Sequence, residues 1–569
     1  MQGSLLWTEK ISLGKIRDPL QLAVFRYTEE YFISGIITQT ERLRYYTFLT
    51  WAWTQIKEGH SDLEKKEIRD LEKILTLASA MHHMEGLPQP NGIRSMKAGM
   101  EYLKNHQKIE LDKFKNFGKR NEQGWGNYYY RGSIKNLGIL WYENNSIKIS
   151  PSAKEISDIF SIHLKNYQNN LWKKTLSKSD LKNISSICCC NISKQEQNFW
   201  LNIFFGLTRI GKNGLETDPN KKLLIKNPDE LSFEQFQVSE DQIDESAFDE
   251  GLTNFTETKT NSTRKELRTG SLLMILKIIK ESMPTIKRTS LLQIIRDSIY
   301  YSQFQTNNSI KSIQFGMLEQ YRRYWEVYVH NQYYVNVFES TLSIITKICQ
   351  EYPLGIEIDY LHKRKVDDDK YLKFINKLGF SATKNDSIGV LFAQLENILK
   401  KKKTSLSNPL NEHKILRLLI VSQSDSEELA MILVLLLLCK YRFSFFDDKQ
   451  LRMLSYKHDK FASVYPENVY NEIDSIKIIE FPKWIFKFII KRHRHVSAKK
   501  LLNSGTKAWL FTEEGNELFF NKEYVFKPYC DVKWINVLEI LHDLGLVEKN
   551  ISKKLWILTK EGEKWLKNQ

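Results

Sequence analysis

The sequence is poor in the two residues that most often interrupt regular structure, with 25 glycines and 12 prolines among 569 residues. So few turn-forming residues favour long helices over a dense succession of strands and turns. Cysteine is also scarce: there are six, none in a Cys-x-x-Cys pair, and we expect them to be reduced. The run Cys188 to Cys190 is not expected to chelate one metal ion well, because adjacent side chains point in different directions. We therefore predict no metal ligand.

Motifs for nucleotide chemistry are absent as well. The sequence has no glycine-rich phosphate loop ending in Lys-Ser or Lys-Thr and no Gly-x-Gly-x-x-Gly fingerprint. It also lacks the His-Glu-x-x-His and Gly-x-Ser-x-Gly motifs. These absences argue against nucleotide hydrolysis and against a dinucleotide cofactor, and we predict no cofactor.

Long hydrophobic runs are missing too. The most apolar stretch, Leu429 to Cys439, has eleven residues, about half of what a helix needs to cross a bilayer. We interpret it as a buried helix. The opening Met1-Gln-Gly-Ser lacks the basic and then apolar regions of a secretion signal. We expect a soluble, cytoplasmic protein that does not contact a membrane.

The composition that is present can build large cores. Hydrophobic residues make up 41% of the chain and aromatic residues 12%, and the length suggests roughly three domains. The formal charge of +16 and the pI near 9.2 favour a polyanionic partner such as DNA or RNA. A lysine-rich chain can also owe its charge to genome composition, and the sequence leaves both explanations open.

A short motif near the C-terminus predicts a helix, a hairpin and a second helix. Apolar residues at the spacing of one helix face are Trp534, Val537, Leu538 and Leu541. Gly545 then stands where helices often end in a left-handed residue. Residues 546–558 read as a two-stranded wing, and Thr559 as the cap of a last helix.

The same order of elements occurs about four hundred residues earlier in the chain. Gly138 ends a helical stretch, residues 139–149 read as a hairpin, and Ser150 caps a helix with Pro151 at its first position. From the glycine to the cap there are 12 residues here and 14 at the C-terminus. The predicted fold class is mainly α: a multi-domain helical body with two small winged-helix-like modules.

Shifts in composition divide the chain into five predicted regions. These are an N-terminal helical region ending in the first module (1–180), a helical segment with an acidic linker (181–262), a central helical domain (263–350), a C-terminal helical domain (351–490), and a basic helix with the second module (491–569). Nine acids within 229–250 indicate the linker, which could also cover a basic groove when no ligand is bound. Residues 313–349 are expected to form a long amphipathic helix.

Two clusters of cations are candidate nucleic-acid-binding residues. The first lies in a stretch where five of the ten residues from 491 to 500 are Lys or Arg, and it comprises Arg492, Arg494, Lys499 and Lys500. The second, at the predicted tip of the C-terminal wing, comprises Lys549, Lys553 and Lys554. A third candidate surface comprises Arg42, Arg44 and Tyr45, which either form an aromatic-basic face for nucleic acid or belong to a core helix that carries two surface arginines.

Two weaker patterns suggest a nuclease instead. Arg323 and His330 share one helix face, as in helical ribonucleases of the HEPN type, although Tyr324 follows the arginine where that motif usually has a polar residue. Glu357 and Asp359, followed by lysines, resemble part of a divalent-metal nuclease site. In both cases a structural role for the charged residues is the alternative.

Several segments resemble large uncharacterised helical proteins of bacterial anti-phage defence loci. The segments are Asp18–Leu20, Gly35–Thr38, Arg42–Tyr46, Trp51–Trp53, Tyr128–Tyr130, Leu137–Leu140 and Asp543–Leu546. The resemblance implies a subunit of a defence complex that works beside an ATPase, helicase or nuclease encoded nearby. Two function classes follow: a non-enzymatic nucleic-acid-binding and scaffolding subunit, or a nuclease.

Overall fold

The computed structural model describes only part of the chain, and all structural statements refer to that part. It covers residues 20, 32–36, 42–56, 61–84, 86, 95–114, 130, 132–134, 136–143, 146–205, 208–211, 214–217, 259–282, 288–306, 309–455, 465–504, 508–526, 528, 532–550 and 555–567. The acidic segment 229–250 and the lysines Lys553 and Lys554 lie outside these residues.

The protein is mainly α-helical, as predicted, and the strands within the described residues pair only in small antiparallel sheets. The buried run Leu429 to Cys439 lies inside α16 (Asp425–Phe443), as expected for a core helix. Among the helices that the structure describes, none combines the length and apolarity needed to cross a bilayer.

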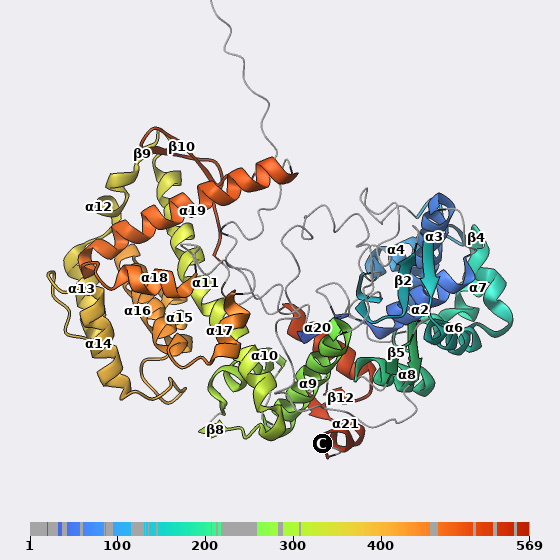
Figure 1. The fold of residues 1–569 in the computed structure, drawn as a ribbon. Helices are drawn as coiled ribbons and strands as arrows, with labels where there is room; N and C mark the ends of the chain where they lie inside the picture. Colours follow the sequence, from blue (N-terminus) through green and yellow to red (C-terminus); the bar gives the residue numbers. More distant parts are fainter. Residues whose placement is uncertain are drawn as a thin grey trace, which may run out of the picture.

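One group of elements comes from the N-terminal part of the chain and lies at the right of Figure 1. Its helices are α2 (Leu43–Gln55), α3 (Ser61–His83), α4 (Met96–Asn105), α6 (Pro151–Leu164), α7 (Lys178–Asn183) and α8 (Lys194–Phe204). Its strands are β1 (Lys108–Glu110), β2 (Leu140–Glu143), β3 (Ser146–Ile149), β4 (Thr175–Ser177), β5 (Thr208–Gly211) and β6 (Gly214–Thr217). Aromatic residues of α2 form much of its core, including Tyr45, Tyr46 and Trp51.

A second group follows the long helix α9 (Lys259–Ser282) and lies at the left of Figure 1. Its helices are α10 (Arg288–Tyr301), α11 (Glu319–Glu351), α12 (Leu361–Lys365), α13 (Asp368–Lys377), α14 (Ile388–Leu399), α15 (Glu412–Val421), α16, α17 (Asp448–Ser455), α18 (Pro466–Ile473) and α19 (Phe481–Ser504). Its strands are β7 (Gln303–Gln305), β8 (Ile310–Ser312), β9 (Ile356–Glu357), β10 (Phe511–Glu514) and β11 (Glu517–Phe520).

Helix α11 is the centre of this second group and differs from its prediction in two ways. It begins at Glu319 rather than near 313, because residues 310–312 pair as a strand with β7 and Gly316 takes a positive φ of 59°. It is also buried on nearly all sides rather than amphipathic, because α10, α16, α17 and α19 all pack against it.

Both predicted helix–hairpin–helix motifs are present and share one hydrogen-bonding scheme. Glycines with positive φ, Gly138 at 74° and Gly545 at 75°, precede the two hairpins. The amide of the next residue, Ile139 or Leu546, donates to the carbonyl five residues back, at 3.2 and 3.0 Å respectively. This bond is part of the Schellman arrangement that ends many helices. The hairpins that follow are β2–β3 and β12–β13 (Val547–Asn550 and Leu555–Leu558).

The residues predicted as caps close both motifs in the same way. The amides of Ser150 and Thr559 donate to the carbonyls of Ile139 and Leu546, at 3.1 and 3.0 Å. Each hydroxyl also accepts from the amide three residues further on, at 3.0 and 3.1 Å, as an N-cap does. Helices α6 and α21 (Lys560–Lys567) then begin.

The C-terminal motif packs between the two groups (Figure 1). At the end of α20 (Val532–Asp543), the carboxylate of Asp543 accepts from the Arg42 guanidinium at 3.0 and 2.9 Å and from the Leu43 amide at 2.9 Å. Near its start, Trp534 packs on Trp325 of α11, with ring centroids 4.3 Å apart. Strand β13 and α21 contact α9. The last residues of the chain therefore join its N-terminal and central parts.

All four predicted region boundaries fall inside continuous helices. The boundary after residue 180 lies in α7, the one after 262 in α9, the one after 350 one residue before the end of α11, and the one after 490 in α19. Because α19 packs along α11, the predicted basic helix belongs to the second group rather than to the C-terminal module.

Candidate functional sites

Helix α19 places a line of cations on the surface of the second group. Its buried face includes Ile485, Phe486, Ile489, Ile490 and Val496. Its exposed half carries Lys483, Lys487, Lys491 and Arg494, which are three or four residues apart and therefore lie close together around the helix axis. Lys499 is also exposed, but it is five residues beyond Arg494 and about 140° around the axis from it. These five exposed cations include two of the four residues predicted in this stretch, Arg494 and Lys499.

Acidic neighbours balance part of this line. Asp359 lies 2.7 Å from the Lys487 ammonium and 3.6 Å from that of Lys483, and the hydrogen bond from Lys487 is the largest cause that lowers the pKa of Asp359. Glu513 of β10 forms an ion pair with Arg494 at 3.0 Å. Both pairs are partly exposed, so solvent screens them strongly. They can exchange for contacts with another anion at little cost.

The other two predicted residues of this stretch are less accessible. The Nε of Arg492 donates to the carbonyl of Leu20 at 2.7 Å, and the residue is half-buried. Lys500 is half-buried as well. Arg492 thus connects α19 to the N-terminal part of the chain.

The predicted wing-tip lysines cannot be treated as one group. Lys549 stands within β12 rather than at the hairpin tip. Its ammonium pairs with the buried carboxylate of Glu539 and lies 5.0 Å from the centre of the Trp556 ring. This lysine supports the packing of α20 on the hairpin, which corrects the prediction that it is a free tip residue. Lys553 and Lys554 lie outside the described residues.

Helix α20 precedes the hairpin β12–β13 and is the helix that the winged-helix prediction would place in a nucleic-acid groove. Among its described residues from Lys533 to Asp543, only Ile535 is exposed. The helix is instead covered by the contacts of Asp543 and Trp534 described above. In this arrangement α20 cannot enter a nucleic-acid groove.

The residues of the ribonuclease alternative are not brought to one accessible site. His330 is fully buried, burial lowers its pKa to about 3, and its Nδ1 lies 3.4 Å from the Tyr300 hydroxyl. Arg323 instead faces outward and forms an ion pair with Asp447 at 2.9 Å. Because a buried histidine cannot reach a ribose hydroxyl, the shared helix face does not make a catalytic pair.

The metal-nuclease alternative also lacks its arrangement. Glu357 ends β9, where its register partner is Glu517 of β11, and Asp359 is paired with lysines. Within the described part of the chain, these two acids belong to no group of three potential metal ligands.

Arg42, Arg44 and Tyr45 are buried, which contradicts the aromatic-basic surface. The alternative, a core helix, is correct for α2, but its two arginines are not on the surface. Arg42 grips Asp543 and donates to the carbonyl of Cys189 at 3.0 Å. Arg44 donates to the carbonyl of Asn191 and pairs with Glu196 at 3.2 Å. Arg42, just before α2, and Arg44, in its first turn, therefore hold the loop 188–191 from inside the protein rather than forming a surface.

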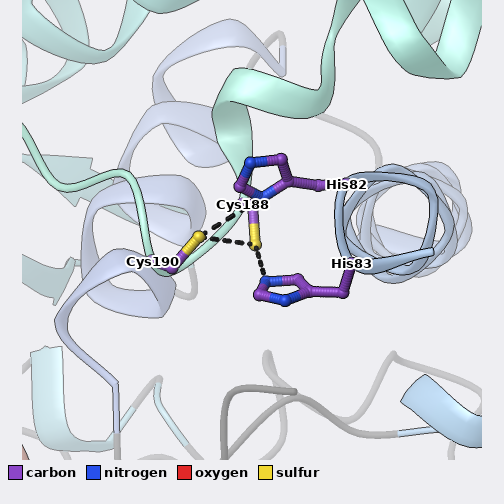
Figure 2. Close-up of side chains that lie close together, drawn as sticks. All are labelled: His82, His83, Cys188 and Cys190. Carbon is purple, nitrogen blue, oxygen red and sulfur yellow. Dashed lines mark hydrogen bonds between the residues drawn. The ribbon is translucent and has the colours of Figure 1, made fainter. Parts of the chain in front are cut away.

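This loop carries two members of a cluster that the sequence did not suggest. Side chains of His82, His83, Cys188 and Cys190 converge, with their ligand atoms all within 4.8 Å of one another. The Sγ of Cys188 lies 3.3 Å from Nε2 of His83, the Sγ of Cys190 lies 3.3 Å from Nδ1 of His82, and the two sulfur atoms are 3.5 Å apart. Figure 2 shows both imidazoles extending from the end of α3 toward the two thiols.

The cluster lies at the edge of the N-terminal group. His83 and Cys188 are buried, His82 is half-buried and Cys190 is exposed. Hydrogen bonds from Cys189 and Cys190 lower the pKa of the Cys188 thiol, and the contact with Cys188 raises that of Cys190. Burial raises the pKa of Cys189. Cys190 is the thiol of the cluster that solvent reaches directly.

Sequence reasoning missed this cluster because it considered only adjacent cysteines. Cys188 and Cys190 are two residues apart, and His83 is 105 residues from Cys188. The available signal was an adjacent histidine pair at a helix end together with a Cys-x-Cys spacing.

Comparisons with protein-family models, curated proteins and solved structures found no match for this chain.

Proposed function

We propose that this chain is a non-enzymatic nucleic-acid-binding and scaffolding subunit of a bacterial anti-phage defence complex, and that it contacts DNA or RNA along α19. The observation that carries the binding proposal is the set of five exposed cations from Lys483 to Lys499. With about 1.5 Å of rise per residue, these cations span roughly 24 Å along the helix axis. That length is enough to meet several successive phosphates of one strand.

The chemistry of such a contact is electrostatic. Lysine and arginine neutralise phosphates and release the counterions condensed on the nucleic acid, so affinity falls as salt rises. Contacts of this kind position a protein without reading bases. The pairs with Asp359 and Glu513 would weaken on binding, and because they are exposed that exchange costs little.

The two helix–hairpin–helix motifs are proposed as winged-helix modules used for packing within the protein. Their matching glycines, hairpins and caps support this assignment. The burial of α20 favours a structural role for the C-terminal module over a groove-reading one. The membership of a defence complex, with an ATPase, helicase or nuclease as partner, rests on the sequence resemblance.

The binding proposal is tested by removing charge from α19. A variant with Lys491→Ala, Arg494→Ala and Lys499→Ala should bind labelled DNA and RNA more weakly. The slope of log affinity against log salt should fall by about 0.9 for each lost duplex contact and about 0.7 for each single-strand contact. A matched control removes three exposed lysines elsewhere, with Lys311→Ala, Lys373→Ala and Lys377→Ala.

Binding measurements with and without Mg²⁺ decide between the two function classes. A mobility shift without cleavage, lost only in the α19 variant, supports the proposal. An equal salt slope for the parent and both variants would show that the cations of α19 are only a solvated face. Cleavage by the parent would identify the chain as a nuclease.

A further inference from the structure

We propose that His82, His83, Cys188 and Cys190 bind one Zn²⁺ ion in a closed structural site. The donor set is two thiol sulfurs and two imidazole nitrogens, which is a common set of ligands for structural zinc. Four protein ligands complete a tetrahedron and leave no open position for substrate. The site is independent of the nucleic-acid surface on α19, which belongs to the second helical group.

The distances fit a tetrahedral ion. With Zn–S bonds of about 2.3 Å and Zn–N bonds of about 2.0–2.1 Å, the edges of the tetrahedron are about 3.3–3.8 Å long. The measured sulfur–sulfur distance is 3.5 Å, and two sulfur–nitrogen distances are 3.3 Å. The widest separation, at most 4.8 Å, can close by side-chain rotation.

Local geometry explains how neighbouring residues reach one point. Adjacent residues of a helix point about 100° apart. His82 nevertheless faces the thiols with Nδ1, the ring nitrogen nearer its backbone, and His83 with Nε2, the farther one. The two imidazoles can therefore reach the same point from the end of α3 (Figure 2). Cys188 and Cys190 alternate with Cys189, and this places their two sulfurs on one side of the loop. Because Cys188 and Cys190 are not adjacent, the divergence expected of neighbouring side chains does not prevent them from binding one ion.

A disulfide does not explain the contact between the two sulfurs. Their separation of 3.5 Å far exceeds a bond of about 2.05 Å, and both cysteines are free. Hydrogen bonds between thiol and imidazole are the remaining alternative. Such hydrogen bonds explain why each thiol lies near one imidazole. They do not require all four potential ligand atoms to lie within 4.8 Å of one another, as these do.

The ion would tie three parts of the chain together. It would join the end of α3 to the loop 188–191, whose Cys189 carbonyl accepts from Arg42. Arg42 in turn grips Asp543 at the end of α20. Bound zinc would therefore stabilise both the N-terminal group and the seat of the C-terminal module.

The first experiment measures metal on the full-length chain. Protein purified under reducing conditions should contain one Zn²⁺ per chain by elemental analysis. Cys190→Ala should weaken zinc binding by more than the roughly 10- to 100-fold that is typical of losing a residue which only hydrogen-bonds a ligand. Cys189→Ala is the matched control, because it removes a neighbouring thiol that only hydrogen-bonds Cys188; it should weaken zinc binding by no more than that factor and still bind one ion per chain.

The second experiment uses the unmutated chain, so that a misfolded variant leaves no ambiguity. After removal of zinc with a chelator, titration with Co²⁺ should saturate at one ion. It should give the intense visible bands of tetrahedral cobalt and a thiolate-to-cobalt charge-transfer band. Hydrogen exchange of α20 should increase in the metal-free protein.

Three results would overturn the proposal. One is a parent chain without stoichiometric zinc and with only the weak spectrum of octahedral cobalt. Another is equal zinc binding by the parent and by Cys190→Ala. The third is a Cys188–Cys190 disulfide in protein kept under reducing buffer.

Discussion

In the second helical group, the cost of substituting a single residue depends on whether it belongs to a network of buried charges. The side chain of Arg442 is 1% exposed and donates to Glu326 at 3.0 Å, and its Nε lies 3.5 Å from Glu412. The hydroxyls of Tyr300 and Tyr301 donate to Glu412 at 3.1 and 2.9 Å. Taking these charged groups out of water costs free energy, and their ion pairs and hydrogen bonds offset that cost only while every partner is present. Substitutions inside this network should therefore be far more harmful than substitutions of exposed ion pairs.

His330 lies beside the same network and makes stability depend on pH. Burial, reinforced by the positive charge of Arg442, lowers the pKa of His330 to about 3 from about 6.5 in the unfolded chain. Between these two values the unfolded state binds the additional proton, so acidification favours unfolding. The stability that comes from neutral His330 is complete above about pH 6.5 and is lost as the pH falls toward about 3.

We predict that His330→Leu flattens the decline of stability on acidification. Urea unfolding measured from about pH 7 to pH 4 should show a smaller loss in the variant than in the parent. The slope should not vanish, because burial also lowers the pKa of His413 to about 3. The exposed His495→Gln serves as a control and should follow the parent. Identical slopes for the parent and His330→Leu would contradict the prediction.

At the scale of elements, the hairpin β12–β13 is held to α20 by a specific ion pair. Lys549 of β12 meets Glu539, whose side chain is 1% exposed, while the Lys549 side chain is 23% exposed. Charge reversal at this position would place two carboxylates together at a largely buried site. We predict that Lys549→Glu lowers the free energy of unfolding by about 1–3 kcal/mol, less than the roughly 3–5 kcal/mol of a fully buried broken pair.

Chemical denaturation of the full chain measures this effect. The control is Lys560→Glu, an exposed residue in the first turn of α21, which should change stability by less than about 0.5 kcal/mol. A folded Lys549→Glu protein of parental stability that nevertheless fails to bind DNA would instead restore the role of this lysine as a nucleic-acid contact.

For the whole molecule, the decisive contact joins the two ends of the chain. Arg42 and Asp543 are 501 residues apart and form a two-point ion pair at 3.0 and 2.9 Å, with side chains 7% and 3% exposed. Aromatic packing of Trp534 on Trp325 and of Trp565 on Phe205 extends the same interface. The C-terminal module, residues 532–567, thus holds the two helical groups together, and this contact is called the clasp.

We predict that Asp543→Ala releases this clasp. The substitution strands a buried guanidinium, which costs about 3–5 kcal/mol. Limited proteolysis and hydrogen exchange should show increased opening of residues 532–567 before the rest of the protein unfolds. Glu513→Ala breaks the exposed pair with Arg494 and should cost no more than about 1 kcal/mol. Equal protection of the C-terminal module in the parent and in Asp543→Ala would rule out the clasp.

Sequence alone determined the features that depend on near neighbours in the chain. Helical content, the buried run from Leu429 to Cys439 and the two hairpins with their glycines and caps all follow from periodicity and from backbone groups a few residues apart. The same local rules indicated a basic stretch on α19 and two of its five exposed cations, Arg494 and Lys499.

Tertiary structure alone decided which of those residues face water and which meet each other. Arg42 and His330 look like surface or catalytic groups in the sequence, but partners hundreds of residues away or on other helices bury them. His82 and His83 acquire thiol neighbours only because α3 packs against the segment leading to Cys188. The physical reason is that helices, turns and caps are set by hydrogen bonds between residues a few positions apart, which a sequence pattern reveals. Burial and the grouping of ligand atoms are set by contacts between segments that lie far apart in the chain, and no local pattern shows which segments will meet.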